Sequence, residues 1–163
     1  IPGSIGISIN GSFEDMLSCL FPSKGKLILI SQEERLSESF LRLENEGFTE
    51  VSYFDINLWF DAGMEISQID RVSASDASKH IEKIIDVSNS EDWEVLHVKG
   101  VSNIPLIELV KFPEKIVTGS VLYCGNGHKS IAAVSFLLTK NIITTDITGG
   151  LSAMLVDSPD LEI

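Results

Sequence analysis

Residues 121–130 read Val-Leu-Tyr-Cys-Gly-Asn-Gly-His-Lys-Ser, and this stretch decides the fold. Its first three residues are apolar, which is typical of the end of a buried strand, and Cys124 follows them directly. The two glycines after the cysteine indicate a tight loop. Ser130 is then predicted to cap a helix over residues 130–140. The sequence therefore predicts a single cysteine at the joint between a strand and a helix.

A loop of this kind suits an anion. The backbone N–H groups of residues 125–130 and the N-terminus of the helix are expected to point toward one spot. The first anion that they would meet is the thiolate of Cys124, which is the nucleophilic form of cysteine. The alternative is that Cys124 is a small core residue at the end of a hydrophobic strand.

The composition limits the function classes that the chain can serve. Its 163 residues, 44% hydrophobic and 22% charged, are typical of one globular domain or two small ones. The formal net charge of -12 argues against nucleic acid and against an anionic membrane surface as partners. No apolar run reaches the length of about 18 residues that a membrane-spanning helix needs.

The chain has two cysteines, Cys19 and Cys124. So few cysteines in a chain of this length favour a reducing compartment, and we expect a cytoplasmic protein. None of the three histidines is spaced as a metal ligand with the cysteines, so neither a bound metal nor another cofactor is predicted. Cys19 is expected to be a packing residue of a short helix.

Strands and helices alternate along the chain, which predicts a parallel α/β sheet. A turn and a short strand are expected within residues 1–7. The helices are expected over residues 12–21, 33–46, 57–62, 75–83, 106–110, 130–140 and 149–155. Further strands are expected over residues 26–30, 51–54, 84–87, 121–123 and 142–145. The composition turns polar between Gln68 and Ser75, which predicts a domain boundary there.

The two halves of the chain show the same order of elements. Residues 27–31 parallel residues 120–124, and residues 54–59 parallel residues 149–154. A repeated order of the same elements implies two copies of one α/β unit. The two predicted units are residues 1–69 and residues 70–163.

The cysteine loop resembles the active-site loop of the rhodanese family of sulfurtransferases. That family places Cys-x-x-Gly-x-Arg, followed by Ser or Thr, between a central parallel strand and a helix. Cys124, Gly127 and Ser130 match this pattern. Lys129 stands where the family usually has Arg, and Gly125 stands where it often has Arg. Both departures lower the local positive charge.

Further motifs of the family follow in the same order. The family opens each domain with an Asp-Val-Arg strand end, a Gly-His-Ile-Pro-Gly-Ala run and an Ile-Pro pair, and later shows a Gly-Gly turn. The corresponding stretches here are residues 86–88, 96–101, 104–105 and 149–150. The first unit begins inside this motif, at residues 1–3, so its opening strand lies outside this sequence or has been lost. The resemblance thus implies an α/β protein with two rhodanese-like domains, each a parallel sheet flanked by helices, the first lacking its opening segment.

The resemblance also implies a sulfurtransferase. The Cys124 thiolate would take a sulfane sulfur from thiosulfate or a low-molecular-weight persulfide and pass it to a thiol or to cyanide. The residues implied to bind the substrate are Gly125, Asn126, Gly127, His128, Lys129 and Ser130. Ser31 occupies the cysteine position of the first unit and cannot hold a persulfide, and the acidic pair Glu33 and Glu34 follows it. The first unit is therefore expected to be inactive.

Two other functions compete with this one. Related folds use Cys-x5-Arg for phosphate, but the sixth position after Cys124 is Ser130, so a phosphatase fits poorly. The stronger rival is a non-catalytic interaction or regulatory module attached to another enzyme domain, because both units lack family arginines. In some bacterial fusions such a pair follows a metallo-β-lactamase-like persulfide dioxygenase domain. By that analogy, an upstream catalytic domain in the same polypeptide is an expected partner.

Overall fold

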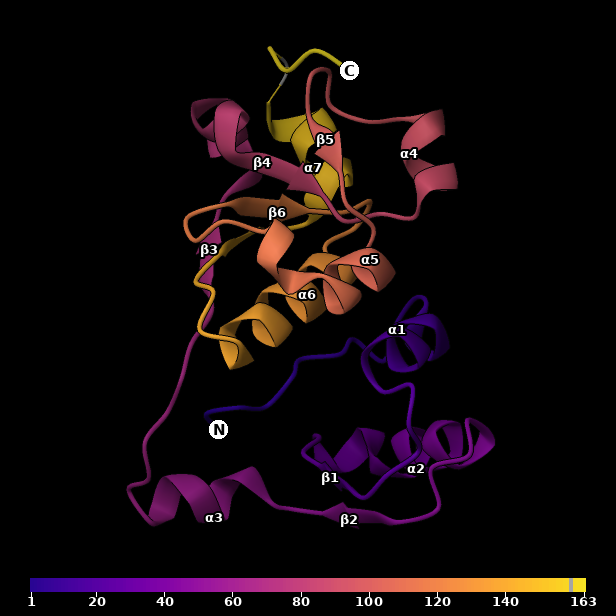
Figure 1. The fold of residues 1–163 in the computed structure, drawn as a ribbon. Helices are drawn as coiled ribbons and strands as arrows, with labels where there is room; N and C mark the ends of the chain where they lie inside the picture. Colours follow the sequence, from indigo (N-terminus) through magenta and orange to yellow (C-terminus); the bar gives the residue numbers. More distant parts are fainter. Residues whose placement is uncertain (159) are drawn as a thin grey trace.

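Five parallel strands form the main sheet of the protein, in the order β3-β7-β6-β4-β5. The structure is a computed structural model that describes residues 1–158 and 160–163 (Figure 1). The strands are β3 (Asp70–Val72), β4 (Ile84–Asp86), β5 (Ser102–Asn103), β6 (Val121–Tyr123) and β7 (Thr145–Ile147). The predicted parallel α/β sheet is thereby confirmed, and β6 lies at its centre.

Successive residues of β6 pack on opposite faces of the sheet, because side chains alternate along a strand. Leu122 faces the helices α5 (Leu106–Lys111) and α6 (His128–Thr139). Val121 and Tyr123 join the core with the 3-10 helix η2 (Ala74–Lys83) and with α7 (Gly150–Asp157). Both faces of β6 are therefore covered, as expected for a central parallel strand.

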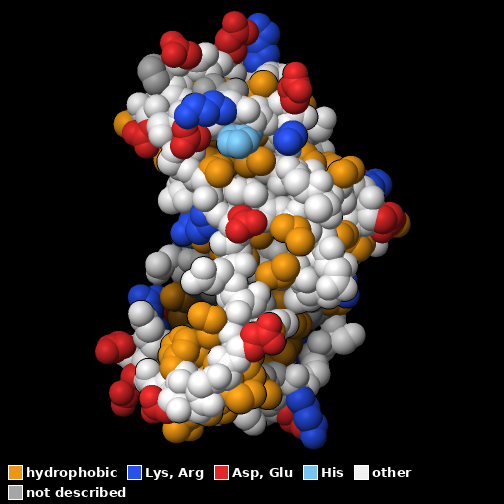
Figure 2. Space-filling model, turned by 90° about the vertical axis from the view of Figure 1, so that its left-hand side faces the viewer, with side chains coloured by type: hydrophobic (Ala, Val, Ile, Leu, Met, Phe, Trp, Pro, Cys, Tyr) orange, Lys and Arg blue, Asp and Glu red, His pale blue; other side chains and the backbone are white. Residues whose placement is uncertain are grey.

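The first unit is built around only two parallel strands, β1 (Leu27–Leu29) and β2 (Val51–Tyr53). Its other elements are α1 (Phe13–Leu20), the 3-10 helix η1 (Glu33–Arg35), α2 (Leu36–Asn45) and α3 (Ile56–Asp61). Its small core consists of Phe13, Leu17, Leu43 and Phe48. Hydrophobic side chains gather on the surface of the lower half of the molecule, where this unit lies (Figure 2).

The two units share the spacing of their elements. Leu27 pairs with Val51 and Val121 pairs with Thr145, so each partner lies 24 residues after the first strand residue (51 minus 27, and 145 minus 121). The helices α2 and α6 end at positions 45 and 139, and α3 and α7 begin at positions 56 and 150. Every one of these pairs differs by 94 in residue number.

This constant spacing corrects one expectation. At an offset of 94, the residue that matches Cys124 is Ile30, and Ser31 matches Gly125. The strand β1 ends at Leu29, as β6 ends at Tyr123, so the parallel of residues 27–31 with 120–124 is one residue out of register. The conclusion that the first unit lacks a cysteine at this place is unchanged.

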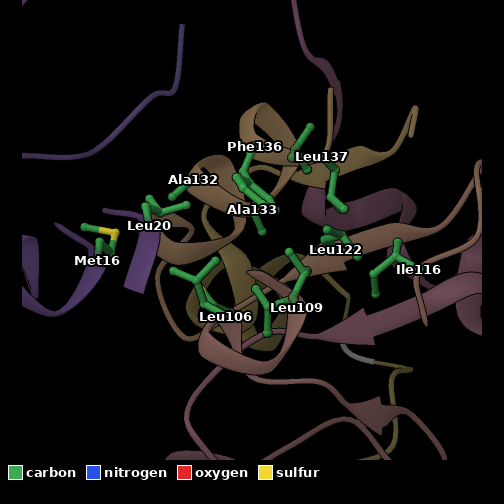
Figure 3. Close-up of a cluster of buried hydrophobic side chains, with 13 residues drawn as sticks. Met16, Leu20, Leu106, Leu109, Ile116, Leu122, Ala132, Ala133, Phe136 and Leu137 are labelled. Atoms are coloured by element: carbon green, nitrogen blue, oxygen red, sulfur yellow. The ribbon is translucent and has the colours of Figure 1, made fainter. Parts of the chain in front are cut away.

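Helix α1 joins the two units. It contacts α5 and α6 of the second unit. Its residues Met16 and Leu20 belong to the same hydrophobic cluster as Leu106 and Ala132 (Figure 3). The first unit is therefore packed on the helical layer that covers one face of the main sheet.

Some predicted boundaries were wrong. The last strand begins at Thr145 rather than at position 142, because the N–H of Ile142 donates to the carbonyl of Leu137 and closes α6. Residues 1–7 form no strand. The helix expected from Ser75 is the 3-10 helix η2, which begins at Ala74.

Four short elements were not predicted. They are the strands β3 and β5, the helix α4 (Ser90–Val95) and the 3-10 helix η3 (Pro113–Lys115). The strand β3 lies in the polar stretch that predicts the domain boundary, and it reads Asp-Arg-Val, so it lacks an apolar pattern. Within the described ranges, no helix is both long enough and apolar enough to span a membrane.

Candidate functional site

Cys124 lies at the carboxyl end of β6, with 2% of its surface exposed. It is part of the wall of a cavity of about 380 Å³. Gly125, Asn126, His128 and Lys129 of the same loop also line this cavity. The structure thus brings most of the predicted site residues together around one hollow. Gly127 and Ser130 are buried behind it.

The helix α6 begins without a side-chain cap. Its N-cap is Gly127, which has φ +86 and no side chain that could accept a hydrogen bond from the first turn. Ser130 is therefore not the cap that the sequence predicts. A residue with a positive φ is needed where the chain turns from the strand into the helix, and glycine adopts it without a steric penalty.

Hydrogen bonds from α7 hold the carbonyl groups of the loop. The N–H of Leu151 donates to the carbonyl of Cys124 at 2.8 Å. Ser152 donates to the carbonyl of Gly125 through both its N–H and its Oγ, each at 2.9 Å. This approach requires Gly150, because a Cβ there would lie 2.0 Å from the Cys124 carbonyl oxygen.

The N–H groups of the loop are left open. Across the described ranges, no protein acceptor pairs with the N–H groups of residues 125–127, 129 and 130. The N–H of His128 donates to Asn126 Oδ1, at 3.3 Å. Free N–H groups at the start of a helix are a favourable place for an anion.

A chain of polar contacts lies behind the cysteine. The Cys124 Sγ is 3.8 Å from Ser130 Oγ, which in turn donates to Asp146 Oδ1 at 2.5 Å. Asp146 is fully buried, and its Oδ2 accepts a hydrogen bond from Arg71 Nε at 2.9 Å and forms an ion pair with Arg71 Nη2, also at 2.9 Å. Because the Ser130 proton is directed to Asp146, the Ser130 oxygen faces the thiol as an acceptor.

The sequence analysis missed Asp146 and Arg71. Arg71 lies on β3, the strand that went unpredicted, and its contact with Asp146 depends on the pairing of β3 with β7. The available signal was an aspartate within a strand that is otherwise apolar or β-branched. Such a residue is buried only when it is paired.

The outer walls of the cavity come from three helices. Asp92 and Leu96 lie on or just after α4, and Leu151 and Leu155 lie on α7. Ser12 and Met16 come from the start of α1, in the first unit. The Lys129 side chain is 13% exposed, and its Nζ lies 3.8 Å from Asp92 Oδ2. The first unit therefore helps to form the cavity around Cys124.

Cys19 differs from Cys124 in its surroundings. It is a half-buried free thiol on α1 that packs against the main cluster. Burial raises the pKa of the Cys19 thiol, and the carboxylate of Asp15 raises it further. Cys19 therefore stays protonated at neutral pH, which agrees with the predicted packing role.

The remaining titratable groups near the site have structural partners. Asp86 Oδ1 accepts a hydrogen bond from the N–H of Ser88, and His97 stacks on Trp93 with ring centroids 3.9 Å apart. Burial raises the pKa of Tyr123, whose hydroxyl accepts from the N–H of Val98. Within the described part of the chain, no cluster of three or more His, Cys, Asp or Glu residues could hold a metal ion.

Comparisons with known proteins agree with this geometry. The family model of the rhodanese-like domain matches residues 71–155. A rhodanese-related protein from Thermoplasma volcanium superimposes with a TM-score of 0.50 at 22% identity, covering 55% of this chain and 93% of that one. The reduced CoADR-RHD of Bacillus anthracis gives a TM-score of 0.52 at 16% identity, covering 80% of this chain and 28% of that one.

A thiosulfate sulfurtransferase from Pseudomonas aeruginosa gives a TM-score of 0.51 at 16% identity, covering 90% of this chain and 34% of that one. At these identities the similarity shows a shared fold. This chain thus spans about a third or less of the length of the two larger proteins. No curated protein matches the chain.

Proposed function

Because the chain belongs to the rhodanese-like domain family, we propose that it is a sulfurtransferase in which Cys124 carries sulfur as a persulfide. The observation that supports this most is the position of Cys124 within a loop whose N–H groups, except that of His128, have no protein acceptor across the described ranges. The donor is thiosulfate or a low-molecular-weight persulfide. The acceptor is a thiol or cyanide.

The proposed cycle has two displacement steps. The Cys124 thiolate attacks the outer sulfur of the donor, and sulfite or a thiolate leaves with the electron pair of the broken bond. The persulfide anion on Cys124 then accepts hydrogen bonds from the open N–H groups among residues 125–127, 129 and 130 and is stabilised by the N-terminus of α6. The acceptor attacks the outer sulfur, and the Cys124 thiolate is released.

We further propose that residues 1–69 are a degenerate copy of the same unit and do not transfer sulfur. The constant offset of 94 between the two units supports this relationship. Ile30 at the position of Cys124 supports the loss of activity, because its side chain has no nucleophile. The protein would then be a tandem pair with one working site.

We also propose a partner domain and a cellular compartment for the protein. The analogy with fusion proteins suggests a metallo-β-lactamase-like partner domain in the same polypeptide. The free thiols of Cys19 and Cys124 favour a reducing compartment such as the cytoplasm. The acidic charge of -12 disfavours nucleic acid and anionic membranes as partners.

The test is sulfur transfer to cyanide from thiosulfate and from glutathione persulfide. We expect the wild type and Cys19→Ser to transfer sulfur and Cys124→Ser to be inactive. If neither donor supports transfer by the wild type, the enzyme proposal is wrong, and a non-catalytic interaction module becomes the better description.

A further inference from the structure

The cavity around Cys124 is poor in positive charge. Lys129 is the single lysine or arginine among the described residues that line it, and its Nζ already lies 3.8 Å from Asp92 Oδ2. A dianion such as thiosulfate would have to share this one lysine with a carboxylate. The sulfite that leaves after transfer is a dianion as well, so it would face the same shortage.

The same cavity is rich in apolar surface. Met16 is fully buried and Leu151 nearly so, and both contribute to its wall. Leu96 and Leu155 also line it, yet they remain 43% and 49% exposed. An apolar ligand would cover these leucines and gain free energy from the area removed from water.

The size of the cavity fits an organic ligand. Its volume of about 380 Å³ lies within the range of roughly 300–1,000 Å³ that is typical of pockets for organic ligands. Cys124 is 2% exposed, so the donor must project its sulfur inward from a body that stays in the cavity. A persulfide on a short stem has this shape.

From these observations, and resting on the proposed sulfurtransferase function, we propose that the preferred donor is the persulfide of a small apolar thiol, and that Asp92 disfavours thiosulfate by pairing with Lys129. The Cys124 thiolate forms a bond to the outer sulfur of R–S–SH while the bond between the two donor sulfurs breaks. The electron pair leaves on R–S⁻, and the proton stays with the transferred sulfur. Neither an oxidant nor a reductant is needed.

The first test compares three donors with the wild type and cyanide as the acceptor. The donors are benzyl persulfide, glutathione persulfide and thiosulfate. We expect kcat/KM to be highest for benzyl persulfide, by about tenfold over thiosulfate, which is the factor expected if a ligand removes part of one leucine side chain from water. Glutathione persulfide should lie between them, because its two carboxylates find no free cation.

The second test uses variants of the cavity wall. Asp92→Asn releases Lys129 and should raise kcat/KM for thiosulfate about threefold relative to benzyl persulfide, in line with a largely exposed ion pair. Leu155→Asn should lower kcat/KM for benzyl persulfide more than for thiosulfate. The matched control is Val156→Asn, the next residue of α7, which is 78% exposed and does not line the cavity. It should change neither value.

The outcomes separate this inference from the proposed function. A wild type that uses thiosulfate or glutathione persulfide at least as well as benzyl persulfide would overturn the donor preference and leave the sulfurtransferase standing. An unchanged thiosulfate value in Asp92→Asn would overturn the role of Asp92. Failure with all three donors would overturn the sulfurtransferase itself.

Discussion

The loops that follow β1 and β6 correspond in position, because the elements of the two units are equally spaced. The loop after β6 has the features of an anion-binding site, and the loop after β1 does not. The strand β6 is buried throughout and pairs on both sides, whereas β1 is half-exposed and pairs only with β2. After β6 come Cys124 and a glycine turn into an uncapped helix. After β1 come Ile30 and the acidic turn η1, whose carboxylates would repel an anion.

The second helix of each unit shows a similar contrast. The helix α7 begins after Gly149, which supplies no side chain to its N-terminus. The helix α3 begins after Asp55, the residue that matches Gly149 at the offset of 94, and Asp55 Oδ1 accepts from the N–H of Asn57 at 2.9 Å. One unit caps this helix with its own carboxylate, and the other does not. Equal spacing of the elements therefore does not bring an equal site, because the candidate site of the second unit depends on its glycines and on the absence of a side-chain cap.

The largest effect is expected for Gly150→Ala. The added Cβ would lie 2.0 Å from the Cys124 carbonyl oxygen and 2.8 Å from the Gly127 nitrogen, at a φ of +60. The clash and the strained backbone should together cost about 3 kcal/mol or more in the free energy of unfolding, and sulfur transfer should be lost. Unfolding in urea measures the first effect, and the transfer assay measures the second.

The control for this variant is Gly63→Ala in the first unit. Gly63 has nearly the same φ, +61, but nothing lies within 4 Å of an added Cβ. Gly63→Ala should lower the free energy of unfolding by only about 1 kcal/mol, because backbone strain is its single effect. Equal losses in the two variants would show that the close approach of α7 to the loop is not what the second unit depends on.

Ser130→Ala should have the next largest effect. It removes the hydrogen-bond donor to Asp146 Oδ1. Because Asp146 is fully buried, the free energy of unfolding should fall by about 1–3 kcal/mol. Ser152→Ala is the matched control, because its hydroxyl is exposed and its own N–H still donates to the Gly125 carbonyl. Chemical denaturation of both variants checks this, and a cost for Ser152→Ala as large as that for Ser130→Ala would contradict it.

Arg42→Ala tests what holds the first unit together. Arg42 Nε and Nη2 donate to the two carboxylate oxygens of Glu14, both at 2.7 Å, and its guanidinium lies over the Phe13 ring. We expect Tm to fall by about 2–4 °C. Lys26→Ala should leave Tm unchanged, because its ion pair with Glu50 is exposed on both sides.

The effect of Arg42 should also depend on pH. Its hydrogen bonds lower the pKa of the Glu14 carboxyl in the folded state. The stability from this contact is therefore present above the ordinary carboxyl pKa and is lost as the pH falls through the lowered one. The difference in Tm between the wild type and Arg42→Ala should shrink in acid, and a difference that grows would contradict this.

The smallest effect is expected for Ile30→Cys in a Cys124→Ser background. It places a thiol at the position of the first unit that matches Cys124. Because the first unit lacks the glycine turn, we expect no persulfide and no transfer. Recovery of transfer would mean that the position in the fold suffices and that the contrast between the two loops is unimportant.

The sequence predicted the parts of the structure that local patterns determine. The central strand, the glycine loop and the helix after it follow from residues 121–130, whereas the repeat inferred from the order of elements stays a prediction. The strand β3 could not be predicted, because Asp70 and Arg71 gain their place only by pairing with β7. The contribution of Met16 to the cavity was missed because it depends on how α1 packs between the units.

The most direct test of the central claim, that Cys124 carries the sulfur, is the intact mass of the protein after incubation with a persulfide donor and again after reduction. We predict that the wild type and Cys19→Ser each gain the mass of one sulfur atom, that reduction removes it, and that Cys124→Ser gains nothing. Sulfur that persists on Cys124→Ser, or a wild type that gains none, would contradict this assignment.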